Sequence, residues 1–215
     1  MIHYSTDYVF DGMKSEPYTE DDAPRPINVY GSSKLAGELA VQAADAPYLI
    51  FRTSWVYGLR GKNFLITILR LAKEQYELRI VADQFGAPTW SRTIAEATAL
   101  ALACSCAKGI EHVSGVYHLI AAGFVSWCGF AEAIVQLSIV RKIQCTLKLI
   151  RIATADYQQA ASRLANSAMS TKKFVAAFDL ALPQWNDALE LCMDSSALLS
   201  SLLCDDTNLS RSTGH

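Results

Sequence analysis

The 215-residue sequence lacks several features that would assign a protein to a class at once. Its formal net charge is only -2, so it has no basic surface of the kind that nucleic-acid or anionic-membrane partners require. No apolar run is long enough to span a bilayer, and no charged-then-apolar leader opens the chain. These absences predict a cytoplasmic protein whose partners are neither nucleic acids nor membranes.

Cysteine and histidine do not occur at metal-binding spacings. The six cysteines include no CxxC pair, and the chain is long enough to build a core without disulfides. The four histidines are scattered, and His118 lies in an apolar run where a core role is expected. We therefore predict reduced, mostly buried thiols and no metal site.

A glycine-rich phosphate loop is also missing. No G-x-G-x-x-G or G-x-x-G-x-x-G follows a predicted strand, so no segment of this chain is expected to bind a dinucleotide pyrophosphate at a helix N-terminus. The absence matters because the rest of the sequence alternates strands with helices, which indicates an α/β fold with a mainly parallel sheet.

The continuous apolar run at residues 48–53 is typical of a strand buried on both faces. A long polar loop, residues 11–29, follows the first strand, and loops of this length are usually functional or disordered. The predicted strands are residues 2–10, 48–53, 78–81 and 116–120. The predicted helices are residues 30–44, 64–73, 91–106 with Ser91 as a cap, 126–138 with a cap, and one starting near Pro183.

One pair of residues carries a specific chemistry. Tyr30 and Lys34 lie four positions apart in a predicted helix and therefore share one face. An ammonium group favours the phenolate form of a nearby phenol, so Lys34 would help Tyr30 to exchange a proton with a carbonyl or an alcohol near neutral pH. The alternative explanation is that Tyr30 and Lys34 are an exposed i,i+4 pair on a solvated helix face, since short motifs often occur by chance.

A hydroxyl residue ends the first predicted strand. Thr6 could donate a hydrogen bond to the same carbonyl oxygen and so stabilise the charge that develops on it. Alternatively, Ser5 and Thr6 simply end a strand and bond their own backbone. The combination of a strand, Thr6, a long loop, Tyr30 and Lys34 is much rarer than any one of these features.

These motifs resemble the extended branch of the short-chain dehydrogenase/reductase superfamily, and within it the dTDP-4-dehydrorhamnose reductase family. The segments that carry the resemblance are YSTDYVFDG (4–12), PYTEDDAPRPINVYGSSKLAGE (17–38), FRTSWVYG (51–58), GKNF (61–64), RLAKE (70–74), DQFGAPTW (83–90), GVYHL (115–119) and LPQW (182–185).

The resemblance implies a role for each matching residue. Tyr30 would give a proton to the C4 carbonyl, Lys34 would bind the nicotinamide ribose, and Thr6 would bond the sugar oxygen. Thr53 would also belong to the cofactor site, and substrate contacts would come from Asp7, Tyr8, Trp55 and Arg163. Leu164 stands where the family usually has proline, which leaves the role of Arg163 open. For Tyr8 and Trp55, ordinary core packing is the alternative.

The resemblance further implies an incomplete Rossmann-like parallel sheet, without its first strands and glycine-rich turn, combined with a small interleaved substrate-binding lobe. We assign residues 1–125 to the Rossmann-like part, with 54–90 contributing to the substrate cleft. Residues 126–193 form mainly the substrate-binding lobe, and 194–215 a frayed tail. Because the cofactor-gripping turn is absent, the chain is expected to be an N-terminally truncated form with little reductase activity.

The implied reaction is reduction of dTDP-4-dehydro-L-rhamnose to dTDP-L-rhamnose with NADPH or NADH. Three alternatives stay open: another nucleotide-sugar 4-ketoreductase, an epimerase, or a non-catalytic regulatory relative. The intact Thr6, Tyr30 and Lys34 argue against the last. The resemblance leaves a homodimer open as a partner state.

Overall fold

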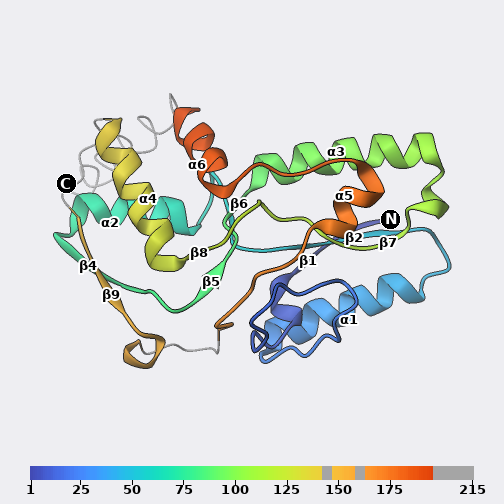
Figure 1. The fold of residues 1–215 in the computed structure, drawn as a ribbon, viewed down its shortest axis with the longest axis horizontal. Coiled ribbons are helices and arrows are strands. Elements are labelled where there is room, and N and C mark those ends of the chain that lie inside the picture. Colours follow the sequence, from blue (N-terminus) through green and yellow to red (C-terminus); the bar gives the residue numbers. More distant parts are fainter. Residues whose placement is uncertain (142–146, 158–162, 196–215) are drawn as a thin grey trace, which may run out of the picture.

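A parallel sheet forms one half of the molecule. The computed structural model describes residues 1–141, 147–157 and 163–195 (Figure 1). Its central strand is β2 (Leu49–Thr53), which pairs in parallel with β1 (Ile2–Thr6) on one side and β7 (Gly115–His118) on the other. All five residues of β2 are buried, as the continuous apolar run predicts. The predicted α/β architecture with parallel strands is confirmed.

Helices cover both faces of this sheet (Figure 1). On one face lies α1 (Val29–Ala43), which connects β1 to β2. The other face packs against α3 (Ser91–Lys108) and α5 (Lys172–Phe178), through a hydrophobic core that includes Phe51, Ile94 and Phe174. The result is a β-α-β unit in which helices bury the apolar surface of the sheet from water.

The second half of the molecule is a smaller lobe (Figure 1). Its elements are α2 (Phe64–Glu74), β4 (Glu77–Val81), α4 (Trp127–Val140), β9 (Lys148–Ile152) and α6 (Trp185–Asp194). The strands β4 and β9 pair in parallel, and one core cluster joins α2, α4 and α6. The proposed 126–193 lobe thus shares its core with α2 and β4, whereas α5 packs beside β7.

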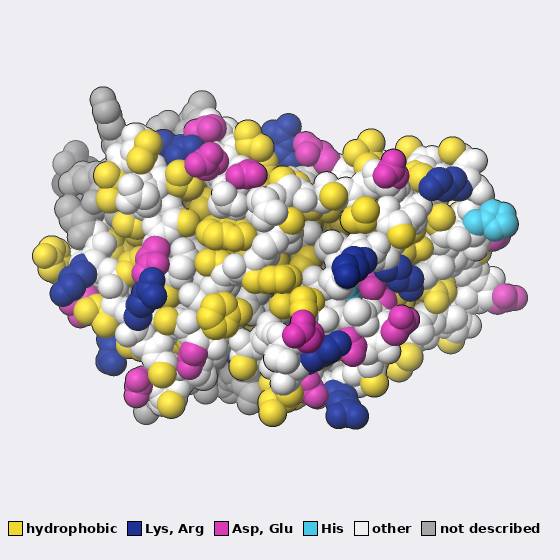
Figure 2. Space-filling model, in the orientation of Figure 1, with side chains coloured by type: hydrophobic (Ala, Val, Ile, Leu, Met, Phe, Trp, Pro, Cys, Tyr) yellow, Lys and Arg dark blue, Asp and Glu magenta, His cyan; other side chains and the backbone are white. Residues whose placement is uncertain are grey.

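Short strand pairs connect the two halves. Strand β3 (Val56–Tyr57) pairs in parallel with β6 (Thr89–Trp90), and β5 (Phe85–Gly86) pairs antiparallel with β8 (Val125–Ser126). Figure 2 shows hydrophobic side chains gathered across the middle of one face, with charges of both signs around them. Backbone pairing of short strands therefore contributes to the junction.

The first predicted strand is too long. It ends at Thr6, because the Thr6 hydroxyl accepts a hydrogen bond from the Tyr8 N–H and turns the chain into a 3-10 helix, η1 (Asp7–Val9). The predicted cap Ser91 is also wrong. Its hydroxyl lies against Gly58, and α3 begins with no side-chain cap.

Other elements agree with the sequence to within a few residues. Helix α4 starts after Ser126, whose hydroxyl accepts from the Gly129 N–H as predicted. Strand β7 ends at His118, two residues before the predicted end. The sequence did not predict α5, β9, or the short 3-10 helices η2 (Ile110–His112) and η3 (Thr154–Asp156).

Four cysteines lie in the described part of the chain, and all four are free thiols. Cys128 and Cys192 are buried as predicted, Cys104 is half-buried and Cys106 is exposed. Cys145 and Cys204, and most of the predicted tail, lie outside the described residues. No described helix has both the length and the apolar character that crossing a membrane demands.

Candidate functional site

The predicted site residues gather at the carboxyl ends of β1 and β2. Thr6 and Thr53 are register partners, the last residues of two neighbouring parallel strands. In open α/β sheets this edge is where ligands bind. The η1 turn follows Thr6 directly and carries Asp7 and Tyr8 at the same edge.

A glycine lets α1 approach this edge very closely. A Cβ atom built on Gly31 would lie 2.0 Å from the Tyr8 carbonyl oxygen and 3.0 Å from the Pro26 side chain. Only glycine fits a helix packed so tightly on a backbone turn. The Asn28 side chain caps the same turn of α1 by accepting from the Gly31 N–H at 2.8 Å. The start of α1, with Tyr30, is thereby fixed against η1.

Tyr30 and Lys34 lie on α1 with their polar ends available. The rings of Tyr30 and Tyr8 meet edge to face, with centroids 5.7 Å apart, and Tyr30 is 55% exposed. Its hydroxyl forms no hydrogen bond to another residue in the described part of the chain. The Lys34 ammonium donates to the Tyr4 carbonyl of β1, and two of its three N–H groups remain for a ligand.

A buried ion pair holds α1 on the sheet. The Arg52 guanidinium of β2 binds both carboxylate oxygens of Glu38, with its closest contact at 2.7 Å, and both side chains are almost fully inaccessible. Ser5 of β1 also donates to Glu38. Glu38 lies one turn beyond Lys34 on α1, so this network sets the position of the helix that carries Tyr30 and Lys34.

Asp7 faces inward. It is 2% exposed, and its two carboxylate oxygens accept hydrogen bonds from Thr6 at 2.9 Å and from Ser54 at 3.1 Å. Burial raises the pKa of Asp7 to about 6, although the hydroxyls of Thr6, Ser167 and Ser54 oppose that rise. Asp7 therefore changes charge close to neutral pH, next to the predicted carbonyl-binding residue.

Thr53 is 8% exposed, and its hydroxyl donates to the Ser5 carbonyl at 3.1 Å. The Thr53 hydroxyl proton is thus used in a hydrogen bond between β2 and β1. Toward a cofactor, this hydroxyl could only accept a hydrogen bond through a lone pair. Its role in cofactor binding stays a prediction.

Trp55 follows β2 in a strained conformation, with a positive φ of 45°. Its indole stacks on that of Trp127 with centroids 3.5 Å apart and planes 6° from parallel. A Cβ atom on Gly86 would lie 2.4 Å from the Trp55 ring, so the DQFGAPT segment packs closely against Trp55. Trp127 covers one face of Trp55, and Gly86 also lies against the ring, so Trp55 is only partly exposed.

Arg163 reaches this region on a segment tied down from both sides. Asn166 donates from its backbone to the Gly12 carbonyl, and Ser167 donates to the Phe85 carbonyl. Arg163 is exposed, and its charge acts on the phenol of Tyr8. Burial nevertheless raises the pKa of Tyr8. The structure thus brings Arg163 to the end of the sheet near Tyr8, across a buried Leu164.

A cavity of about 270 Å³ opens beside these residues, between α2, β4 and α4. Phe64, Ile68 and Trp127 supply much of its apolar wall, while Gln84, Tyr157 and Arg163 add polar groups. Such a combination of apolar walls and a few polar groups is typical of a small-molecule site.

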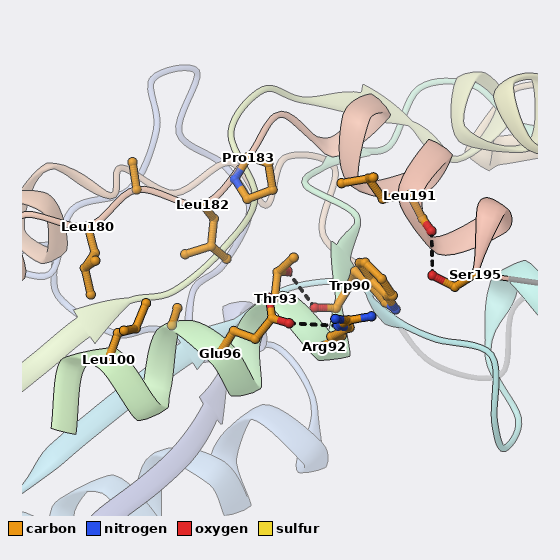
Figure 3. Close-up of a pocket in the computed structure, with 12 residues that line it drawn as sticks. Trp90, Arg92, Thr93, Glu96, Leu100, Leu180, Leu182, Pro183, Leu191 and Ser195 are labelled. Carbon is orange, nitrogen blue, oxygen red and sulfur yellow. Dashed lines mark hydrogen bonds and ion pairs between the residues drawn. The ribbon is translucent and has the colours of Figure 1, made fainter. Parts of the chain in front are cut away.

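A second cavity, of about 350 Å³, lies elsewhere, between α3, residues 180–183 and α6 (Figure 3). Its polar groups are engaged with each other: Arg92 pairs with Glu96, and Thr93 donates to the Trp90 carbonyl. This cavity shares no residue with the Tyr30 site and offers no converging unpaired groups for catalysis.

His118 lies in the core, as predicted. It is 0% exposed, and its Nδ1 atom is 3.1 Å from the Ser170 carbonyl oxygen. Burial lowers the pKa of His118 to about 3, so it carries no charge at neutral pH. Its backbone N–H donates to the Glu20 carboxylate, which ties the 11–28 loop to β7.

The sequence missed several residues of this region. Trp127, the first residue of α4 after the cap Ser126, was assigned no role, although it stacks on Trp55 and lines the 270 Å³ cavity. Ser54 and the pair Glu38–Arg52 also went unnoticed. A buried arginine in a strand needs a buried acidic partner, so Arg52 within an apolar run could have indicated a pair such as Glu38–Arg52.

Comparisons with known proteins agree with this geometry. A family model described as the RmlD substrate binding domain matches residues 1–198. A dTDP-4-dehydrorhamnose reductase from Burkholderia thailandensis is 50% identical over 197 residues, covering 89% of this chain and 66% of that protein.

Two solved structures are similar as well. One is the same reductase from Bacillus anthracis in complex with NADP, at 35% identity and a TM-score of 0.78, over 91% of this chain and 65% of that one. The other is a Clostridium acetobutylicum ortholog at 32% identity and a TM-score of 0.80, over 90% and 64%. This chain spans less than two thirds of the length of these relatives. The fold is Rossmann-like, and the chain belongs to the RmlD substrate-binding domain family.

Proposed function

We propose that this protein binds a dTDP-linked 4-keto sugar and takes part in its NADPH-dependent reduction, dTDP-4-dehydro-L-rhamnose to dTDP-L-rhamnose. The observation that carries the proposal is that Tyr30 meets Tyr8 just after β1, while Lys34, one turn further along α1, bonds the Tyr4 carbonyl of the same strand. The relatives named dTDP-4-dehydrorhamnose reductase support the choice of substrate.

Tyr30 is the proposed proton donor. Reduction of a ketone adds a hydride to carbon and a proton to oxygen, and the exposed hydroxyl of Tyr30 has a free proton to give. Thr6 and Tyr30 would both act on the carbonyl oxygen, where negative charge develops as the hydride arrives. Lys34, next to Tyr30 on the helix face, would stabilise the phenolate left behind.

The residues present fit the nicotinamide end of a cofactor. Two N–H groups of the Lys34 ammonium and the Tyr30 hydroxyl are available to a ribose, and Thr53 offers a lone pair. When bound, the reduced nicotinamide supplies the hydride. NADP in the Bacillus anthracis relative supports NADPH as the donor, and NADH remains an alternative.

The nucleotide part of the substrate would occupy the cavity beside Trp127. A guanidinium such as Arg163 suits a diphosphate, because its planar donors match two oxygens at once. The exposed part of the Trp55 ring would offer a flat apolar surface to a sugar or a base. Tyr8 would complete the sugar end of the site, whereas the carboxylate of Asp7, predicted as a substrate contact, is buried behind Thr6.

Binding of the nucleotide sugar tests the proposal without dependence on a cofactor. Isothermal titration calorimetry with dTDP-L-rhamnose should give a measurable affinity, and Arg163→Ala should weaken it by about tenfold or more, since a lost charged hydrogen bond costs about 1.5–3 kcal/mol. Arg92→Ala, on α3 at the other cavity, is the matched control. Equal loss in both variants would contradict the assignment.

Catalysis is tested by Tyr30→Phe. This variant should bind dTDP-L-rhamnose as the wild type does, while NADPH-dependent reduction of the keto sugar falls by about 100- to 10,000-fold. Preference for another nucleotide sugar in the same titrations would favour a different 4-ketoreductase or an epimerase. Because little reductase activity is expected of this chain, absent turnover alone does not separate the alternatives; capture of a stable partner protein together with absent cofactor binding would favour a regulatory relative.

A homodimeric state and a cytoplasmic location also stay predictions. A homodimer is tested by light scattering of the purified protein. The expected cytoplasmic location is tested by fractionation of cells that produce it.

A further inference from the structure

The hydroxyl proton of Thr6 is donated to Asp7, although the proposed function requires Thr6 to donate it to a substrate carbonyl. A hydroxyl has one proton and two lone pairs. Thr6 gives its proton to Asp7 at 2.9 Å and accepts the Tyr8 N–H at 3.3 Å. A ketone oxygen can only accept hydrogen bonds, so in this arrangement Thr6 has nothing to donate to it.

The surroundings of Asp7 explain why the proton points there. Both carboxylate oxygens lie inside the protein, one at the Thr6 hydroxyl and the other at the Ser54 hydroxyl. With a side chain this deeply buried, these hydroxyls replace the water that would otherwise solvate the charge. An ionised Asp7 therefore attracts the Thr6 proton.

A protonated Asp7 would reverse the bond. The carboxylic acid has a proton of its own to donate to the Thr6 oxygen, which frees the Thr6 proton to turn toward the site. We propose that Asp7 is a positioning residue that acts through Thr6: as the acid it turns the Thr6 hydroxyl toward a substrate carbonyl, and as the carboxylate it withdraws it. This role rests on the proposed function, because it presumes a keto sugar.

The ionisable side chains near Asp7 are phenols and one guanidinium group. Tyr8 lies in the same turn, Tyr30 faces Tyr8 from α1, and Arg163 acts on Tyr8 from the 163–167 segment. From the β2 side and from the segment after Arg163 come the uncharged Ser54 and Ser167. Burial raises the pKa of the Tyr8 phenol above its ordinary value, whereas the pKa of Asp7 lies at about 6.

The consequence is a ligand-dependent effect of pH. A keto sugar needs a donor and should bind about two- to tenfold more weakly at pH 8 than at pH 5, since one neutral hydrogen bond is lost. The 4-hydroxy product can donate its own proton to a lone pair of Thr6, so its affinity should change much less. The measured quantity is therefore the ratio of the two affinities. Both ligands carry the same diphosphate, so any effect of pH on that group is the same for both and does not change the ratio.

Variants separate this role from a structural one. Asp7→Asn cannot titrate, so the affinity ratio should become independent of pH. Thr6→Val removes the hydroxyl and should abolish the pH dependence as well. Ser54→Ala is the matched control, because it removes a hydroxyl from the other oxygen of Asp7 and should keep the pH dependence, with its midpoint moved upward.

The test is calorimetric titration of dTDP-4-dehydro-L-rhamnose and dTDP-L-rhamnose at pH 5 and pH 8 for these four proteins. A wild-type ratio that does not change, or one that still changes in Asp7→Asn, would overturn the proposal. If neither sugar binds, the proposed function fails, and carbon NMR titration of the Asp7 carboxyl decides the positioning role. Its midpoint should move upward in Thr6→Val, and an unchanged midpoint would overturn it.

Discussion

Because Gly31 lies directly against the Tyr8 carbonyl, the single methyl group added by Gly31→Ala should lower both stability and activity. In Gly31→Ala the new Cβ would lie 2.0 Å from that oxygen, and the obstacle is backbone on both sides. Helix α1 and η1 must therefore separate by about 1 Å or more to restore normal contact. Overpacking of this kind costs about 1–3 kcal/mol, and the gain of about 1 kcal/mol in helix propensity offsets only part of it.

Gly37 on the same helix provides the control. A Cβ there would meet only the His3 ring at 3.4 Å, an ordinary contact, so Gly37→Ala should be neutral or slightly stabilising. The net loss is about 0–2 kcal/mol, so with a urea slope of about 2 kcal/mol/M Gly31→Ala should lower the unfolding midpoint by up to about 1 M. It should also weaken catalysis, since misplacement of Tyr30 by about 1 Å can cost 100-fold. Equal midpoints for the two variants would refute the close packing of α1 on η1.

Three further predictions concern buried groups. Glu38→Leu leaves the Arg52 charge buried alone and should cost about 3–5 kcal/mol by urea unfolding, whereas adding Arg52→Leu should recover much of this; strictly additive losses would contradict the buried pair. Because the pKa of Asp7 is raised from 3.8 to about 6 in the folded protein, Asp7 stabilises the fold below pH 3.8, and that contribution is lost as the pH rises through about 6. Between pH 4 and pH 8 the free energy of unfolding of the wild type should therefore fall by roughly 2 kcal/mol relative to that of Asp7→Asn. A difference between the two proteins that does not change with pH would argue against the raised pKa. Trp127→Leu uncovers one face of Trp55, whose fluorescence should shift to longer wavelength; an unchanged spectrum would mean that the rings do not stack.

The sequence predicts those parts of the fold in which pattern and burial agree. All of β2 is buried, and its apolar run predicted that. The spacing of Tyr30 and Lys34 correctly placed both on one helix, and Thr6 does end the preceding strand. These predictions succeed because each rests on a local rule, such as strand burial, helical periodicity or a polar residue at a strand end.

Other features depend on contacts that no local pattern shows. The buried residues of α1 are Gly31 and Glu38, so the helix has no apolar stripe to mark its inner face. Glu38 is buried because Arg52 of β2 meets it there. The stacking of Trp55 on Trp127 likewise joins the segment after β2 to α4. Such pairs are set by the tertiary fold, which overrides the propensities of single segments.

A crystal structure of this protein with bound dTDP-L-rhamnose tests the central claim most directly. The claim predicts the sugar C4 oxygen within hydrogen-bonding distance of the Tyr30 hydroxyl and of Thr6, with the diphosphate at Arg163 and the nucleotide beside Trp127. A nucleotide sugar bound instead between α3 and α6, in the cavity of Figure 3, with Tyr30 left in solvent, would contradict it.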